Sequence, residues 1–324
     1  MKSNSSLKNQ KFTMIKLIIA LIAIYFIYIE GSKQLKKYDF IEVMNLLQGI
    51  KLSSIITLLI FAFITVSSMT IYDYFLLKHI NYNVSLFRVW KISWIANSFN
   101  NFLNFAGLTG ASLRTFLYKK QGISTKEAIY ASAMMAPSTV IGICIASWLI
   151  ILNVLKVRPV LIQYRFLWLG LIGFALYVII YILLYEWKWL SKKIMSKVEK
   201  CENSPKELRW KLVGSSAIEW TLICLFFWFI CSVFTGEIIF LEAAGIIVIS
   251  AIAGIISFIP GGMGSFDLIC LVGLEFMGAS SERAMTILIT YRVFYYIVPW
   301  FLGVILGMTE LIDRKYYKTT WIYL

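Results

Sequence analysis

Five ionisable side chains interrupt long apolar stretches of the sequence: Asp73, Arg114, Glu219, Asp267 and Arg292. A charged residue at the centre of a membrane helix costs ~2.5–3.5 kcal/mol, so each of these residues is a candidate functional site. A carboxylate such as Asp73 or Glu219 can bind a cation or a lipid amine. The planar guanidinium of Arg114 can bind a phosphate group. The residue types therefore predict a site that complements both signs of charge.

Most of these residues also have a structural interpretation. Asp73 lies near one end of its apolar stretch, where an acidic side chain would reach the membrane interface. Arg114 precedes two lysines and would anchor the chain at the cytoplasmic face. Asp267 and Arg292 would pair with each other and hold the segment between them in place. Glu219 lies about two turns inside its stretch, so it is expected to face other helices and to have a partner.

Two glycine-containing segments are expected to be breaks in helices that line this site. Their residues are Gly107, Gly110, Pro260, Gly261, Gly262 and Gly264. Proline lacks an N–H group and glycine is conformationally free, so a cluster of them ends a helix. A broken helix at membrane depth survives only where it packs inside protein or lines a water-filled cavity.

The two segments also belong to a weak internal repeat. Residues 105–110 resemble residues 259–264, and residues 122–128 resemble residues 278–284. Chance similarity between two glycine-containing loops is an alternative explanation. If the repeat is real, paired broken segments in two halves indicate a binding site between them, as in secondary transporters.

The composition indicates a membrane protein. Of the 324 residues, 60% are hydrophobic, whereas roughly 45–50% is usual in soluble domains. We predict an all-α, polytopic membrane helical bundle with about seven or eight spans and one or two broken or re-entrant segments. A basic N-terminus (1–12) and a basic C-terminal tail (312–324) would flank a transmembrane domain (13–311). Spans are expected near 13–29, 52–77, 127–153, 166–185, 212–234, 238–259 and 284–311, whereas 266–278 is too short to cross alone.

The distribution of Lys and Arg predicts the topology. Residues 1–16 and 186–211 are both basic and should be cytoplasmic, which places the N-terminus in the cytoplasm. An even number of crossings between them requires the segment 92–118 to enter the membrane and return to the same side. This segment contains four asparagines, Asn97, Asn100, Asn101 and Asn104. Because asparagine is costly to expose to lipid, these side chains should face protein or water.

Several classes of function are not expected. The single histidine, His79, and five scattered cysteines form no zinc or redox motif, so we predict no metal site and no cofactor. No Ser-His-Asp or Cys-His arrangement is present, so no catalytic residue is predicted. The net charge of +14 is explained by topology and by attraction to anionic membrane lipids. Direct binding of nucleic acid is therefore not expected.

Several stretches resemble a known family. They are IYDYFLL, NSFNNFLNFAGLTGASLRTFLYKK, SSAIEWTL, SFIPGGMGSFDLICLVGLEFMG and ILITYRVFYYIVPW. The chain resembles, from about residue 12 to 312, the membrane region of bacterial phosphatidylglycerol lysyltransferase, the multiple peptide resistance factor. The resemblance implies a flippase-like module that moves lysyl-phosphatidylglycerol to the outer leaflet, in which Asp73, Arg114 and Glu219 match charged positions associated with that activity. It further implies a cytosolic domain that transfers lysine from lysyl-tRNA, which the expected stretches between spans are too short to form.

We therefore expect a lipid translocase of the bacterial plasma membrane. Its substrate would be lysyl-phosphatidylglycerol or a related aminoacyl phospholipid. The result would be a less negative cell surface and resistance to cationic antimicrobial peptides. An alternative is the membrane part of a phosphatidylglycerol lysyltransferase whose catalytic domain is on another chain or missing. A third interpretation is a scaffold that only sequesters lipid or a partner. A separate synthase subunit and a homo-oligomer are compatible with these interpretations.

Overall fold

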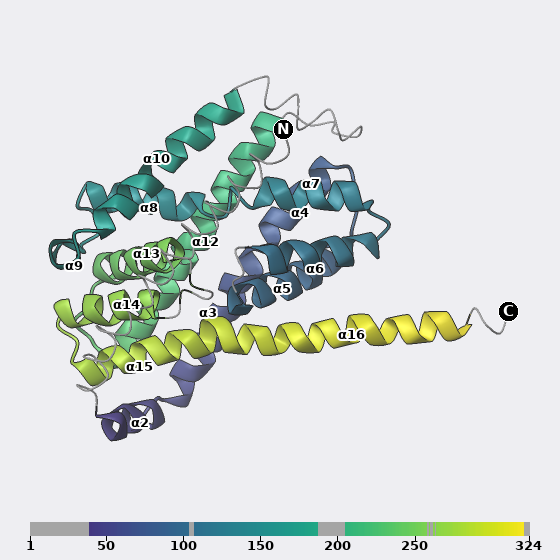
Figure 1. Cartoon of the computed structure of the whole chain (residues 1–324). Helices are drawn as coiled ribbons and strands as arrows, with labels where there is room; N and C mark the ends of the chain where they lie inside the picture. Colours follow the sequence, from purple (N-terminus) through teal and green to yellow (C-terminus); the bar gives the residue numbers. More distant parts are fainter. Residues whose placement is uncertain are drawn as a thin grey trace, which may run out of the picture. The chain divides into compact units, whose positions relative to one another are not determined.

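The computed structural model describes residues 39–103, 107–186, 205–257, 259, 262 and 264–320. All secondary structure within these ranges is helical (Figure 1), which confirms the predicted all-α fold. The predicted first span at 13–29 and the loop residues Pro260 and Gly261 lie outside the described residues. So do the basic N-terminus (1–12), most of the basic segment 186–211 and the last residues of the C-terminal tail.

Long apolar helices are present where the hydropathy pattern places spans. Within the described residues, three stretches are long and apolar enough to cross a membrane: Leu52–His79, Glu207–Phe234 and Ser281–Glu310. Shorter apolar helices cover Ile141–Ile151, Leu167–Leu183 and Phe240–Ile256. These helices correspond to the expected spans after the first, except for the stretch 127–153.

The stretch 127–153 is not one helix. It consists of α7 (Thr125–Met135) and α8 (Ile141–Ile151), which are separated by a turn. Pro137 lies in this turn and has no N–H group to continue the helical ladder. The Ser138 hydroxyl instead donates to the carbonyl oxygen of Met134 at 3.1 Å. The apolar pattern continues across the turn, so hydropathy alone did not reveal the break.

The chain divides into two compact units. The first comprises Met1–Lys51, Ala146–Ala175 and Phe227–Thr290, so far as these are described. The second comprises Leu52–Ile145, Leu176–Phe226 and Tyr291–Leu324, with the same restriction. Helices α8, α10 (Leu167–Glu186) and α12 (Pro205–Phe234) contribute to both units.

The second unit is built around a helical hairpin. Helix α5 (Leu86–Leu103) and helix α6 (Leu108–Lys119) pack against each other, and α6 also packs on α7 (Figure 1). Because α6 returns along α5, the hairpin has the entry-and-return form predicted for 92–118. The position of this hairpin in a membrane stays a prediction.

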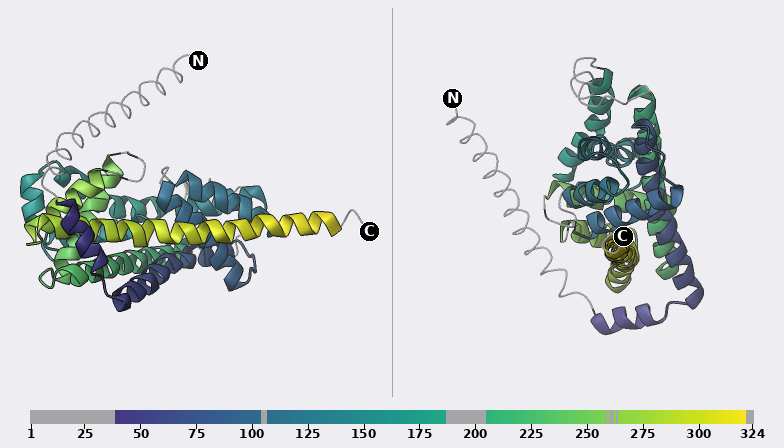
Figure 2. Two further views of the ribbon diagram at one scale, coloured as in Figure 1. Left: turned by 90° about the horizontal axis from the view of Figure 1, so that it is seen from below. Right: turned by 90° about the vertical axis from the view of Figure 1, so that its right-hand side faces the viewer.

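The remaining helices of the second unit enclose this hairpin with apolar side chains. Helix α3 (Leu52–Ser68) and helix α4 (Thr70–His79) pack on α5. The C-terminal helix α16 (Val298–Thr320), a long rod drawn in yellow in Figures 1 and 2, also packs on α5 and follows the π-helix η2 (Val293–Ile297). Buried Tyr72, Leu76, Ile92 and Leu117 belong to one core cluster that joins α4, α5 and α6.

The first unit contains a second helical hairpin. Helix α13 (Phe240–Ile256) packs along α14 (Ser265–Phe276), which also contacts the short helix α9 (Arg158–Gln163). The connection that precedes α14 approaches α13 closely, because a Cβ on Gly262 would lie 3.1 Å from the Cα of Gly254. Helix α2 (Phe40–Gln48), capped by the Asp39 carboxylate, and most of α15 (Ser281–Arg292) complete this unit.

The two hairpins share the same local plan, which supports the internal repeat. Helices α6 and α14 are each 12 residues long and each follow a glycine with positive φ, Gly107 at 80° and Gly264 at 87°. Each is followed by a second such glycine, Gly122 at 83° and Gly278 at 95°. The backbone bond from Ile123 to the Tyr118 carbonyl has its counterpart in the bond from Ala279 to the Leu274 carbonyl. The pairing of Gly122 with Gly278 agrees with the predicted match of 122–128 to 278–284. Gly107, however, corresponds to Gly264 and not to Gly261, so the first match is shifted by three residues from the predicted one.

A tight crossing of α8 and α12 within the second unit generates a stability prediction. A Cβ on Gly142 would overlap the carbonyl oxygen of Ser216 and the ring of Trp220. The Gly142 N–H also donates to the Ser216 hydroxyl at 2.8 Å. We expect Gly142→Ala to destabilise the protein by about 1–3 kcal/mol, because the backbone must move to relieve the overlap. Thermal unfolding of the purified chain in detergent micelles would measure the change.

Gly214→Ala is the matched control, since Gly214 also lies in a helix and has open space around its missing Cβ. We expect this variant to be as stable as the parent or more stable, because alanine has the higher helix propensity. Equal stability of the two variants would contradict the close packing of α8 on α12.

Candidate functional site

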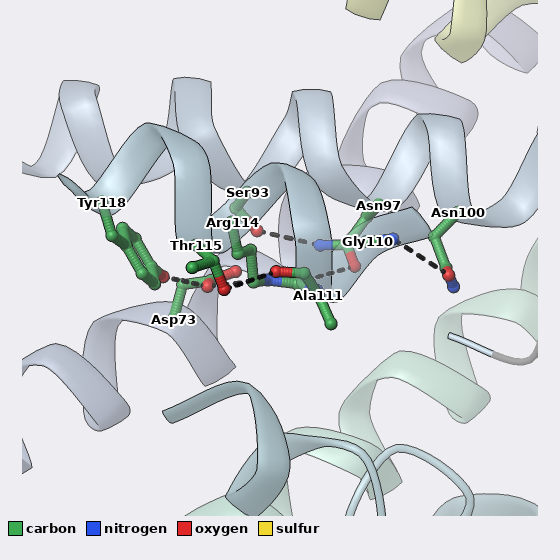
Figure 3. A network of polar contacts seen from close by, with 9 residues as sticks. All are labelled: Asp73, Ser93, Asn97, Asn100, Gly110, Ala111, Arg114, Thr115 and Tyr118. Carbon is green, nitrogen blue, oxygen red and sulfur yellow. Dashed lines mark hydrogen bonds and ion pairs between the residues drawn. The ribbon is translucent and has the colours of Figure 1, made fainter. Parts of the chain in front are cut away.

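A buried ion pair lies at the centre of the second unit. Arg114 of α6 and Asp73 of α4 are joined by a contact of 3.0 Å between the guanidinium Nε and the carboxylate Oδ1 (Figure 3). The side chains of Arg114 and Asp73 are 7% and 0% exposed, respectively. Asp73 therefore does not reach a membrane interface within this unit, and Arg114 does not serve as a surface anchor.

Neutral polar side chains complete the contacts of this pair. Tyr118, one helical turn after Arg114 on α6, donates its hydroxyl to the same Oδ1 atom of Asp73. Asn97 of α5 accepts a bond of 2.5 Å from Nη2 of Arg114 and donates to the Ser93 hydroxyl at 3.0 Å. Residues four apart on a helix share a face, so Ser93 and Asn97 lie on one face of α5, and Arg114 and Tyr118 lie on one face of α6.

The second carboxylate oxygen of Asp73 is an acceptor without a donor. Oδ2 is buried and has no hydrogen-bond partner among the described residues. A buried carboxylate oxygen without a donor is unfavourable, and an ammonium group would satisfy it. The Asp73 side of the ion pair therefore lacks a donor at this oxygen.

Gly110 packs closely against the guanidinium. Its missing Cβ would lie 3.1 Å from Nη1 of Arg114 and 3.1 Å from the Cβ of Asn100. The Gly110 N–H points to the side-chain oxygen of Asn100 at 3.4 Å (Figure 3). The first glycine segment thus contributes to the site directly, because a side chain at Gly110 would crowd both Arg114 and Asn100.

Glu219 of α12 belongs to the same polar cluster. Its carboxylate accepts a bond of 2.6 Å from the hydroxyl of Tyr72, the residue next to Asp73 on α4. Glu219 is 6% exposed and lies close enough to Arg114 to interact with its charge. The expectation that Glu219 faces other helices and has a partner is confirmed.

Aromatic rings border Glu219. Tyr295 of η2 lies within electrostatic range of the Glu219 carboxylate. Its ring stacks on Tyr291, with centroids 5.2 Å apart, and is tilted against Phe226 of α12. A π-helical turn is frequent at functional sites, and here it carries Tyr295 towards the acidic side chain. Neutral rings around a carboxylate form an environment that favours a bound cation.

Asp267 and Arg292 make local contacts within their own units. In the first unit, the Asp267 carboxylate accepts from the N–H of Gly264 at 2.8 Å, so it caps the start of α14. In the second unit, the Arg292 guanidinium lies 4.9 Å from the ring centroid of Tyr296. A role of either residue in binding a headgroup stays a prediction, as does a pairing between them.

Three of the five predicted charged residues thus converge within the second unit, while their neutral partners were not predicted. Tyr118 follows Arg114 by four residues, and Tyr72 adjoins Asp73 in the sequence. The spacing of Tyr118 from Arg114 was a usable signal, since polar residues four apart share a helix face.

The comparison with known proteins identifies the chain. Residues 13–303 match the family model described as the lysylphosphatidylglycerol synthase TM region. The chain belongs to this family. Similar proteins include phosphatidylglycerol lysyltransferase of Bacillus subtilis (strain 168), which is 28% identical over 308 residues, covering 95% of this chain and 36% of the relative. The enzymes of the same name from Staphylococcus haemolyticus (strain JCSC1435) and Staphylococcus aureus (strain MSSA476) are 26% and 27% identical and cover 96% and 95% of this chain.

The chain spans about a third of the length of these curated relatives, 36%, 36% and 35% of the three. It corresponds to their membrane region, and membership of the family makes this a membrane protein. Asp73, Arg114 and Glu219 all lie within the matched range.

A double-mutant cycle would test the energetic role of the ion pair. We expect Asp73→Asn to destabilise the protein by about 3–5 kcal/mol, because it leaves the buried charge of Arg114 unpaired. The double variant Asp73→Asn/Arg114→Met should recover much of this loss, because neither charge remains. Thermal unfolding in detergent would measure all four proteins of the cycle. If the two single effects simply add in the double variant, the pair does not act as a unit.

Proposed function

We propose that the chain forms a lipid translocase module that moves lysyl-phosphatidylglycerol, or a related aminoacyl phospholipid, across the bilayer. The family match and the names of the relatives support a phospholipid substrate. The observation that carries the proposal is the buried cluster of Arg114, Asp73 and Glu219. A membrane interior tolerates such charges where they serve binding or transport.

The chemistry of the cluster matches the headgroup group by group. The guanidinium of Arg114 suits phosphate, and the glycine at position 110 places no side chain against its Nη1 atom. The unpaired Oδ2 of Asp73 and the carboxylate of Glu219 suit the ammonium groups of an aminoacyl ester. Opposite charges that accompany the headgroup lower the cost of its passage through a low-dielectric region.

The proposed consequence is a change in the surface of a bacterial cell. Lysyl-phosphatidylglycerol in the outer leaflet makes the surface less negative and weakens the attraction of cationic antimicrobial peptides. The location that fits this role is the plasma membrane, with the basic N-terminal segment in the cytoplasm. A separate synthase subunit and a homo-oligomer belong to the same proposal as partners to be tested.

The second candidate function is enzymatic. The relatives are named phosphatidylglycerol lysyltransferases, and this chain spans 36% of the length of the Bacillus subtilis protein. The chain would then be the membrane part of a lysyltransferase that uses lysyl-tRNA and phosphatidylglycerol. Its catalytic domain would be supplied by another chain or by sequence outside these 324 residues.

Lipid analysis would separate the two candidates. The chain would be expressed alone in a host that makes no aminoacyl lipids, and lysyl-phosphatidylglycerol would be measured by mass spectrometry. We expect none to be formed, because the described residues provide two carboxylates and an arginine but no site for an aminoacyl ester of tRNA. Formation of the lipid would overturn the translocase proposal.

If the chain alone forms no lipid, a separate synthase would be co-expressed and outer-leaflet amines would be labelled with an impermeant reagent. Increased labelling at constant total lipid is the expected result.

Glu219 provides the sharpest test of the mechanism. We expect Glu219→Gln to reduce outer-leaflet labelling by at least about tenfold, because the neutral amide no longer compensates an ammonium group at this depth. The protein should remain folded, since glutamine can still accept the bond from Tyr72.

Glu207→Gln is the matched control on the same helix. The side chain of Glu207 is 56% exposed and pairs with Lys211 at 2.5 Å, away from the buried cluster. This variant should translocate lipid normally. Normal labelling by the Glu219→Gln protein, at equal expression, would remove Glu219 from the proposed mechanism.

A further inference from the structure

A second charged cluster lies at the open end of the α5–α6 hairpin in the second unit. Glu310 of α16 contacts Arg88 and Lys91 of α5 through the same oxygen, Oε1, at 2.8 Å and 2.7 Å. Lys120, directly after α6, lies 3.6 Å from Oε2 and donates to the Glu310 carbonyl oxygen at 2.7 Å. One carboxylate thus joins three cations that lie on or next to the two helices of the hairpin. These cations appear in the sequence as ordinary anchoring residues.

The cluster has excess positive charge that the described residues do not neutralise. Within the described residues, the ion pairs of the three cations all converge on Glu310, which leaves a formal charge of plus two. The side chains of Lys91, Lys120 and Glu310 are only 9%, 15% and 7% exposed. Concentrating like charges in a poorly solvated place is unfavourable unless a counter-ion is present. The arrangement therefore favours the binding of an additional anion.

The location of the cluster indicates which anion is available. Arg88 lies in the first turn of α5, Lys120 follows the last turn of α6, and Glu310 lies beside them within α16. Under the predicted topology this end of the hairpin lies at the membrane surface, where lipid phosphates lie. Basic sites between helices at this level bind anionic headgroups. The Arg88 side chain, 38% exposed, keeps part of its guanidinium accessible from outside.

We propose that Arg88, Lys91 and Lys120 bind the phosphate group of an anionic phospholipid such as phosphatidylglycerol. Glu310 holds the three cations together and leaves their remaining N–H groups to the phosphate. This site is distinct from the cluster around Arg114. Lys91 and Asn97 are separated by about 9 Å along α5, from the rise of an α-helix. A lipid held at the hairpin base would thus have its headgroup next to the helix that leads to the buried cluster.

Charge variants would test the site by the direction of their effects. The purified full-length chain in a neutral maltoside detergent would be titrated with short-chain phosphatidylglycerol, and binding would be followed by microscale thermophoresis. Arg88→Gln should weaken binding about fivefold, the effect of roughly one basic residue on an anionic lipid. Glu310→Gln should strengthen binding by a similar factor, because the net charge of the cluster rises. Arg88→Lys should retain most of the affinity.

Matched controls come from the exposed pair Glu207 and Lys211. Lys211 is 39% exposed, close to the value for Arg88, and Lys211→Gln and Glu207→Gln make the same charge changes elsewhere. These variants should change the affinity less than twofold. A cluster that is merely structural would not give opposite shifts for Arg88→Gln and Glu310→Gln. Shifts in the same direction, or shifts equal to the controls, would overturn the proposal.

Two further titrations would identify the ligand. Inorganic phosphate tests a free anion, and phosphatidylcholine tests a phosphate group whose headgroup has no net charge. We expect phosphatidylglycerol to bind more tightly than either. Binding of inorganic phosphate with the same charge dependence, and no gain from the lipid, would reassign the site to free phosphate. Arg88 is partly exposed, so the Arg88→Gln result stands even if Glu310→Gln does not fold.

Discussion

The pairing of Asp73 with Arg114 is the constraint on which the second unit depends. Neither side chain can reach bulk water, so each charge must be compensated within a few ångströms. The guanidinium has a fixed planar geometry, which restricts where its partners can lie. Asp73 on α4 and Asn97 on α5 occupy two of these directions, and Arg114 itself comes from α6. One side chain therefore determines how three helices approach one another, and apolar packing fills the space around it.

The two hairpins share a backbone plan but differ in the side chains they bury. Both α6 and α14 lie between glycines with positive φ, a conformation that costs other residues free energy. Helix α6 uses this frame to bury Arg114 and Tyr118, whereas α14 buries Leu271 and Leu274. Its two acidic residues, Asp267 and Glu275, are less buried, and Asp267 caps the helix start. The two copies thus share turns and helix lengths. Of these two helices, only α6 buries a charged side chain.

The sequence was sufficient to predict the fold class and the charged core of the site, and for a physical reason. Hydropathy depends only on the order of residues along the chain. A charged residue such as Glu219 within an apolar stretch can therefore be recognised without any knowledge of contacts. Neutral partners such as Tyr72 were not conspicuous, because tyrosine is common in membrane helices and at their ends. The turn at Pro137 was missed because the apolar sequences on both sides of it together have the length of one membrane span. The cluster at Glu310 was missed because its partners lie about 190–220 residues away in the chain, and no local pattern records that contact.

The formal charges of the two clusters are opposite, so the second unit contains two places of opposite net charge. Asp73, Glu219 and Arg114 sum to minus one, whereas Glu310 and its three cations sum to plus two. Phosphatidylglycerol has one negative phosphate, whereas lysyl-phosphatidylglycerol adds two ammonium groups and so has a net positive headgroup. Under the proposed function, the positive cluster would favour the anionic lipid and the negative cluster the lysylated one. Selectivity would then come from the sign of the net charge at each place, because both headgroups have the same phosphate and only the ammonium groups distinguish them.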